Sequence, residues 1–214
     1  MRPAAVRLLA AGGALAPIVL TAAWVAAGFA QDDYSARRED ISALAARSAQ
    51  HPWLMIAGLV TSGVLVVAFA LALHRGIRGG SVAGVALVAL CGFGMVALGL
   101  LRNDCSSLTE ECQARVEAGE VSWQHTAHDL LSAPVFAAAV AAPAVLALRF
   151  RADPSWRSLT PLSAAATPVL AVLFILGGLE AAPSWNGVVQ RVAVSAALVW
   201  LESVALRLLK IGPP

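Results

Sequence analysis

The chain has 214 residues, of which 59% are hydrophobic and 13% are charged, and its formal net charge is +2. A soluble globular protein carries about 25% charged residues, whereas this chain contains long uncharged runs of Ala, Leu, Val and Gly. A helix of about 20 such residues crosses the hydrocarbon core of a bilayer. The composition therefore excludes a soluble domain and predicts an all-α, polytopic membrane bundle.

Six apolar segments follow one another and form one integral membrane domain over residues 1–214. They cover approximately residues 4–29, 52–73, 81–101, 124–148, 159–179 and 188–209. The first segment begins beside Arg2 and Arg7, as a signal peptide would. Its apolar run is longer than the roughly 7–15 residues of a cleaved signal, so we predict a retained transmembrane helix.

Local signals refine this assignment in chain order. In the polar stretch after the first segment, Asp40 is placed to cap a short surface helix through Leu44 to Arg47. Pro52 suits the first turn of the second helix. The third segment contains small residues that allow close helix packing in lipid, namely Gly84, Gly92, Gly94 and Gly99.

The charges of the connecting segments alternate along the chain. Nine basic residues fall on the side of both termini: Arg2, Arg7, Arg75, Arg78, Arg149, Arg151, Arg157, Arg207 and Lys210. The other side holds six arginines and eleven of the thirteen acidic residues. Because Lys and Arg are enriched in cytoplasmic loops, we expect a multi-pass cell-membrane protein with both termini in the cytoplasm.

Two of the three cysteines, Cys105 and Cys112, lie in the longest loop, on the predicted extracytoplasmic side. Such a pair can form a disulfide in an oxidising compartment, and two free thiols are the alternative. A zinc site at these cysteines is disfavoured, because two cysteines without close partners make an incomplete ligand set. Cys91, inside the third segment, is interpreted as a buried apolar residue.

The unusual polar residues gather near the predicted extracytoplasmic ends of segments two to six. The central stretch is 123–132, and a helix there places His125, His128, Asp129 and Ser132 in pairs that share one face. Its expected neighbours are His51, Asp104, Glu180, Gln190 and Arg191. Ionisable residues in membrane helices are costly and are functional candidates by default.

Three interpretations of this cluster stay open. One is a metal site, with zinc the best candidate, held by His125 and His128 with a third ligand such as His51 or Asp104. Another is metal-free acid–base catalysis, in which Asp129 or Asp104 orients one of the two central histidines. The third is structural: an ion pair between Asp129 and a residue of another helix, and histidines that satisfy a helix terminus.

Two residue features support the structural interpretation. Asp129 and Arg191 each lie about one turn inside a predicted helix, so they are candidates for an ion pair. Tryptophans are expected to anchor the bundle at the two membrane surfaces. Trp53, Trp123 and Trp185 are assigned to an extracytoplasmic belt, and Trp156 to a cytoplasmic one.

Two functions therefore compete. The first is an enzyme that acts on a lipid or isoprenoid, with catalytic candidates His125, His128, Asp129, Asp104 and Arg191 and substrate-binding candidates His51, Ser132, Glu180 and Gln190. The alternative is a non-catalytic protein, such as a lipid or small-molecule carrier, a partner subunit or a sensor. Membrane lipids are the expected partners. Nucleic-acid binding is not expected, because no basic patch contains clustered aromatic residues.

The chain resembles, over nearly its whole length, the six-helix bacterial membrane proteins of domain-of-unknown-function family 998. The resemblance rests on the order of five features, namely Tyr34-Ser35, Asp40-Ile41-Ser42-Ala43-Leu44, Asp104 after the third segment, His125 or His128 opening the fourth, and Gln190-Arg191 opening the sixth. It implies a six-helix membrane fold. It implies no established activity.

Overall fold

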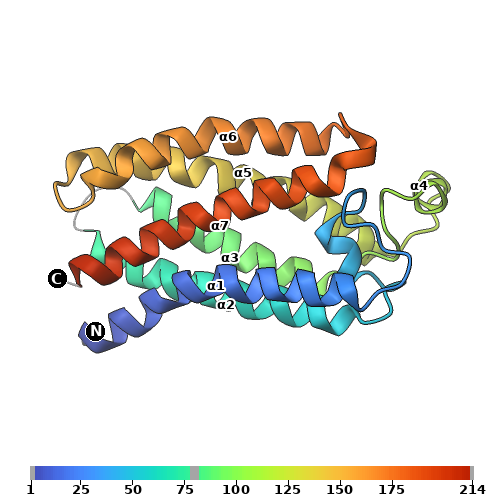
Figure 1. Cartoon of the computed structure of the whole chain (residues 1–214), viewed down its shortest axis with the longest axis horizontal. Helices are drawn as coiled ribbons and strands as arrows, with labels where there is room; N and C mark the ends of the chain where they lie inside the picture. Colours follow the sequence, from blue (N-terminus) through green and yellow to red (C-terminus); the bar gives the residue numbers. More distant parts are fainter. Residues whose placement is uncertain (1–2, 78–81, 213–214) are drawn as a thin grey trace.

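The computed structural model describes residues 3–77 and 82–212, and regular structure over them is entirely helical. Six long helices run along one axis (Figure 1): α1 (Pro3–Phe29), α2 (Pro52–Gly76), α3 (Ala83–Leu100), α5 (Trp123–Ala152), α6 (Thr160–Gly178) and α7 (Asn186–Ile211). All six are long and apolar enough to span a membrane, which confirms the predicted fold class. Arg2, Arg78 and the predicted helix start at Ser81 lie outside the described residues.

Shorter helices lie in the connections: the 3₁₀ helices η1 (Ile41–Ala45), η2 (Arg157–Leu159) and η3 (Pro183–Trp185), and the α-helix α4 (Glu110–Glu117). Both chain termini lie at one end of the bundle, and α4 projects from the other end (Figure 1). We refer to these as the terminal end and the α4 end. The even number of long helices accounts for the shared position of the termini.

The largest boundary difference concerns the fourth long helix, predicted to end near Leu148 and observed to end at Ala152. The prediction stops at the last uncharged residue. In the structure, Arg149 and Arg151 belong to the last turn of α5. Cations interact favourably with the carbonyl end of a helix dipole, so the helix continues past the apolar run.

The six long helices form a closed ring. Each packs against its neighbours in the order α1, α2, α3, α5, α6 and α7, and α7 packs back against α1. Across the ring, the described residues make only limited contacts, between α2 and α7 and between α5 and α7. The backbones therefore approach one another closely around the ring but rarely across it, and side chains occupy much of the interior.

Small residues set the spacing where α2 crosses α3. A Cβ atom built on Gly92 would lie 2.8 Å from the carbonyl oxygen of Gly63, and one on Gly63 would lie 2.6 Å from that of Gly92. Only glycine allows the two backbones to approach so closely. The predicted packing role of the glycines in the third segment is thus confirmed at Gly92.

Large apolar side chains close the ring at the terminal end. Phe69, Leu73, Phe150, Trp156 and Leu208 belong to one buried cluster. Trp156 is 1% exposed and stacks on Phe150, with ring centroids 5.1 Å apart. Its assignment to a membrane-surface belt is therefore wrong, because its ring is buried in the core. Trp53, Trp123 and Trp185 are exposed, as expected of belt residues.

The short helix η1 lies inside the α4 end of the bundle rather than on its surface. Its residues Ile41 and Leu44 pack in one buried cluster with Trp24 of α1 and Met55 of α2. The prediction of a surface helix capped by Asp40 is therefore wrong in two respects. Asp40 does occupy the N-cap position of η1, but the helix is buried, and the Asp40 side chain makes no capping hydrogen bond.

A disulfide closes the loop before α4. The sulfur atoms of Cys105 and Cys112 are at bonding distance, 2.01 Å, and their Cα atoms are 5.7 Å apart. Thr109 caps α4 by accepting a hydrogen bond from the backbone N–H of Cys112 at 3.3 Å. The expected disulfide is thus present in the structure, and it ties the start of this loop to a capped helix.

Candidate functional site

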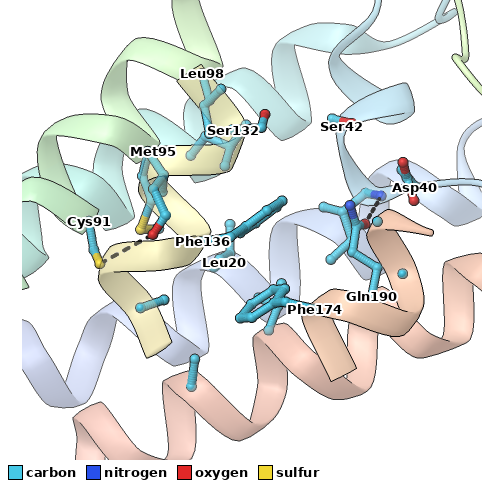
Figure 2. A pocket seen from close by; sticks show the side chains of 18 of the residues that line it. Leu20, Asp40, Ser42, Cys91, Met95, Leu98, Ser132, Phe136, Phe174 and Gln190 are labelled. Atoms are coloured by element: carbon cyan, nitrogen blue, oxygen red, sulfur yellow. Dashed lines mark hydrogen bonds between the residues drawn. The ribbon is translucent and has the colours of Figure 1, made fainter. Parts of the chain in front are cut away.

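The ring encloses a cavity of about 450 Å³ that is lined by residues from all six long helices. This volume lies within the roughly 300–1,000 Å³ range of ligand pockets. Figure 2 shows its two sides: Asp40 and Gln190 lie together, and Cys91 and Met95 of α3 lie opposite them. The cavity thus has a polar region at the α4 end and an apolar region deeper in the bundle.

Apolar side chains line the deep region. Val66 of α2, Val88 of α3, Ala142 of α5 and Trp200 of α7 contribute to the wall. Nearer the polar region, Phe136 of α5 and Phe174 of α6 stack with ring centroids 4.6 Å apart and planes inclined by 18°. This stack joins two neighbouring helices of the ring and borders the space that Figure 2 shows.

We call the polar region the mouth of the cavity. Its residues are Asp40, Ser42, Asn103, Ser107, His128, Asp129, Ser132, Glu180, Asn186 and Gln190. Three of them are acidic, and among the described lining residues none is Lys or Arg. Glu180 is exposed and the Asp129 side chain is 50% exposed, so the mouth opens toward the α4 end.

Three buried oxygen atoms in the mouth have no hydrogen-bond partner among the residues that the structure describes. They are Oδ1 of Asp40, Oδ1 of Asn103 and Oδ1 of Asn186. Asn103 is 2% exposed and Asn186 is 4% exposed. Buried polar atoms are nearly always paired in folded proteins, so these acceptors indicate a place where a bound molecule donates hydrogen bonds.

Asp40 has a strongly altered titration. Its pKa is raised from 3.8 to about 6. Burial is the largest cause of this rise, Arg191 opposes it, and the negative charges of Glu180, Asp129 and Glu39 add to it. Burial and the neighbouring negative charges together outweigh the attraction to Arg191, so the pKa stays raised. The mouth therefore holds a carboxylate whose charge is poorly compensated by the protein itself.

His128 is the central histidine of the mouth. Its Nδ1 lies 2.6 Å from the carbonyl oxygen of Leu101, and a carbonyl can only accept, so Nδ1 carries the proton in this contact. In the neutral ring, Nε2 is then the nitrogen that carries the lone pair. Ser132 Oγ donates to the backbone carbonyl of His128 at 2.9 Å, and this contact does not activate it as a nucleophile.

His125 lies behind the mouth and connects two segments. Its Nδ1 accepts a hydrogen bond from the backbone N–H of Asp104 at 3.2 Å. Its Nε2 then carries the proton in the neutral ring and lies 3.3 Å from Asp129 Oδ2, although the alignment is not that of a hydrogen bond. His125 is 1% exposed and joins the loop before α4 to the start of α5.

Asp104 organises the start of α5. It accepts hydrogen bonds from the backbone N–H of Ser122 at 2.5 Å and from Ser122 Oγ at 2.9 Å, and Arg47 lies 3.4 Å from it. Desolvation alone would raise the pKa of Asp104. The Ser122 hydrogen bonds, together with Arg47 and His125, outweigh this effect, so the pKa of Asp104 lies below its usual range. Ser122 in turn caps α5.

Arg191 holds the segment after α1 against the start of α7. Its Nη1 donates to the carbonyl oxygens of Ala36, Glu39 and Gly187 at 2.8–2.9 Å, and its Nη2 donates to the hydroxyl of Tyr34. The structure records no ion pair between Arg191 and Asp129 in the part of the chain that it describes. The side chain that was expected to pair with Asp129 instead binds backbone carbonyls.

The predicted zinc ligands do not gather into a group of three in the part of the chain that the structure describes. Within the described residues, the histidines, cysteines and acids bring three ligand atoms within 4.8 Å of one another only at Cys105, Cys112 and His125. Both of those cysteines are joined in the disulfide, which removes the thiolates that a metal requires. His125 and His128 do not form such a group with His51 or Asp104.

The structure thus brings together five of the nine predicted site residues in the mouth: His128, Asp129, Ser132, Glu180 and Gln190. His125, Asp104 and Arg191 lie outside the cavity lining and support the surrounding segments. His51 is exposed and also lies outside the lining.

The sequence prediction missed Asp40, Asn103 and Asn186 as mouth residues. Their positions in the sequence could have indicated a place at the end of the bundle. Asn103 and Asn186 lie next to predicted ends of apolar segments, and Asp40 lies in the polar connection after the first segment. Asparagine and aspartate are common in turns, so residue type alone does not separate them from ordinary loop residues.

Comparison with known proteins identifies the chain at the level of a family. The family model described as "Protein of unknown function (DUF998)" matches residues 14–207. No curated protein and no solved structure matches the chain. Since the match covers most of the sequence, including the whole of α2, α3, α5 and α6 and most of α1 and α7, the chain belongs to the DUF998 family of membrane-type helical proteins.

Proposed function

We propose that the protein binds a single-chain, lipid-like amphiphile in the central cavity. The observation that carries this proposal is the division of one continuous cavity into an apolar deep region and a polar mouth. An alkyl chain among Val88, Ala142 and Trp200 would be removed from water, which is favourable at about 25 cal/mol per Å² of apolar surface. A polar head group would then lie at the mouth, beside Asp129 and Gln190.

The same proposal includes an orientation in the cell membrane. We infer that both termini are cytoplasmic and that the mouth faces the extracytoplasmic side. The basic residues of the loops at the terminal end support this orientation. The disulfide between Cys105 and Cys112 at the opposite end supports it independently, because disulfides persist in oxidising compartments.

A cavity-filling substitution tests the binding proposal. Ala139 lines the cavity, whereas Ala137 on the same helix is exposed outside it. Wild-type protein and Ala137→Phe should co-purify with a bound single-chain amphiphile detectable by mass spectrometry after solvent extraction. Ala139→Phe should lose it, because the phenyl ring occupies the space of the alkyl chain. Equal amounts of amphiphile on both variants would refute the proposal.

A second candidate function is catalysis on the bound amphiphile, and it rests on the orientation of His128. With Nδ1 protonated toward the carbonyl oxygen of Leu101, Nε2 carries the lone pair that a general base requires, and His128 lines the mouth. Asp129 and Ser132 line the same region, so a polar group or an ester of the amphiphile would lie within reach of these side chains.

Lipid composition distinguishes binding from catalysis. Membranes of cells that lack the protein are compared after complementation with wild type, His128→Gln or His51→Gln at equal protein levels. Catalysis predicts that His128→Gln resembles the uncomplemented cells, while His51→Gln, which alters an exposed residue outside the cavity, resembles wild type. A wild-type lipid profile with His128→Gln would leave binding as the function.

A further inference from the structure

We infer that the mouth selects an amphiphile whose head group is a protonated amine. This inference rests on the proposed binding of an amphiphile and specifies its chemical class. It depends on three features of the mouth: the hydrogen-bonding character of its unpaired atoms, the sign of its charge and the spacing of its carboxylates.

The unpaired atoms are all acceptors. Among the described residues that line the cavity, the buried polar atoms without a partner are Oδ1 of Asp40, Asn103 and Asn186. The two asparagines are at most 4% exposed, so bulk water does not readily satisfy them. An alkylammonium group carries three N–H donors and no acceptor. A phosphate or carboxylate head would instead bring further acceptors to these oxygens.

The charge of the mouth is negative. Asp40, Asp129 and Glu180 line it, and their mutual repulsion contributes to the raised pKa of Asp40. Arg191 is the nearby cation, but its guanidinium donates to backbone carbonyls and to Tyr34 and does not line the cavity. A cationic head group would supply the positive charge that the lining lacks.

The spacing of the acids favours an organic cation over a metal ion. The three carboxylates form no group of ligand atoms within 4.8 Å of one another in the described part of the chain. Calcium and magnesium require several oxygen ligands at about 2.0–2.6 Å from one ion. Acceptors that surround a wider opening instead suit an ammonium group with its hydrogen atoms directed to different partners.

The position of Trp200 provides a direct assay. Trp200 lines the deep region and is 4% exposed, so a bromine atom at the end of a bound alkyl chain would quench its fluorescence. The protein is placed in phosphatidylcholine nanodiscs and titrated with 12-bromododecylamine, 12-bromododecanol or 12-bromododecanoate. Trp200→Phe protein supplies the background from the other tryptophans and from probe dissolved in the bilayer.

The inference predicts that the amine binds at least about tenfold more tightly than the alcohol, and that the carboxylate binds most weakly. Asp40→Asn should reduce the preference for the amine over the alcohol at least about threefold. Asp33→Asn, an exposed change in the same connection, should leave it unaltered. Butylamine, which has the head group without the chain, should compete only weakly.

Each other result has a definite meaning. Equal or tighter binding of the alcohol or the carboxylate overturns the amine inference and leaves the binding proposal standing. Competition by butylamine as strong as by dodecylamine would instead refute the proposed binding of an amphiphile, since the alkyl chain would then contribute nothing, and the inference that rests on it would fall too. Absence of Trp200 quenching by all three probes refutes the proposed function, and the inference with it.

Discussion

Asp40→Asn should stabilise the ligand-free protein, and its effect should depend on pH. The substitution keeps the shape of the side chain and removes its charge. Asp40 makes no side-chain capping hydrogen bond with η1, and its Oδ1 atom has no partner, so the variant loses no recorded side-chain contact there. The main change is that a partly buried carboxylate no longer ionises in the folded protein.

The magnitude follows from the raised pKa. Folding shifts the pKa of Asp40 from 3.8 to about 6, so the folded state binds this proton more tightly than the unfolded state. Ionisation therefore destabilises the fold progressively as the pH rises from about 4 to above 6, and the effect reaches about 3 kcal/mol at neutral pH. At about pH 4.5 the same relation predicts that ionisation of Asp40 destabilises the fold by only about 1 kcal/mol.

Thermal unfolding followed by tryptophan fluorescence in a neutral detergent tests this prediction. For a protein of this size, 1 kcal/mol corresponds to about 2–4 °C in Tm. Asp40→Asn should therefore raise Tm by about 6–12 °C at about pH 7.5 and by about 2–4 °C at about pH 4.5. The matched variant Asp33→Asn should change Tm little. A gain independent of pH, or a loss of stability at neutral pH, would contradict the reasoning.

Three further substitutions or treatments have distinct expected effects on Tm. Arg191→Ala should destabilise the protein by about 3 kcal/mol, because four hydrogen bonds to loop and helix groups are lost; an unchanged Tm would contradict this. Reduction of the disulfide between Cys105 and Cys112 should cost about 2 kcal/mol, from the chain entropy of a short loop, and Cys105→Ser should show the same loss without reductant. Glu180→Gly should stabilise the protein by about 1 kcal/mol, because Glu180 has a φ of 47°, a left-handed conformation that glycine adopts without strain. Glu180→Gln keeps the Cβ atom and should not stabilise the protein.

The sequence predicts the transmembrane helices well because the membrane leaves few alternatives. A backbone in hydrocarbon must satisfy its own hydrogen bonds, so a long apolar run becomes a helix. The six runs and the acidic loop with Cys105 and Cys112 therefore indicate the fold class and the disulfide correctly. Hydropathy does not specify which helices are neighbours, so the closed ring and its interior become visible only in three dimensions.

Side-chain partners were harder to predict than helices. Opposite charges at similar depth suggest a pair between Asp129 and Arg191, yet backbone carbonyls at the start of α7 and in the segment after α1 satisfy Arg191. Carbonyl positions depend on how a loop folds, and the pattern of residue types does not contain that information. Trp156 illustrates the same limit, since an aromatic residue near a helix end can either face lipid or stack in the core.

Several unfavourable features coincide at the mouth of the cavity. Asp40 ionises against the effect of burial, Asn103 and Asn186 leave acceptors unpaired, and Glu180 adopts a left-handed backbone conformation that favours glycine. Features of this kind each destabilise a fold and tend to occur at functional sites. A merely structural polar cluster would pair its groups internally, as Asp104 and Ser122 do nearby. The contrast between these neighbouring sets argues that the mouth is completed by a bound molecule.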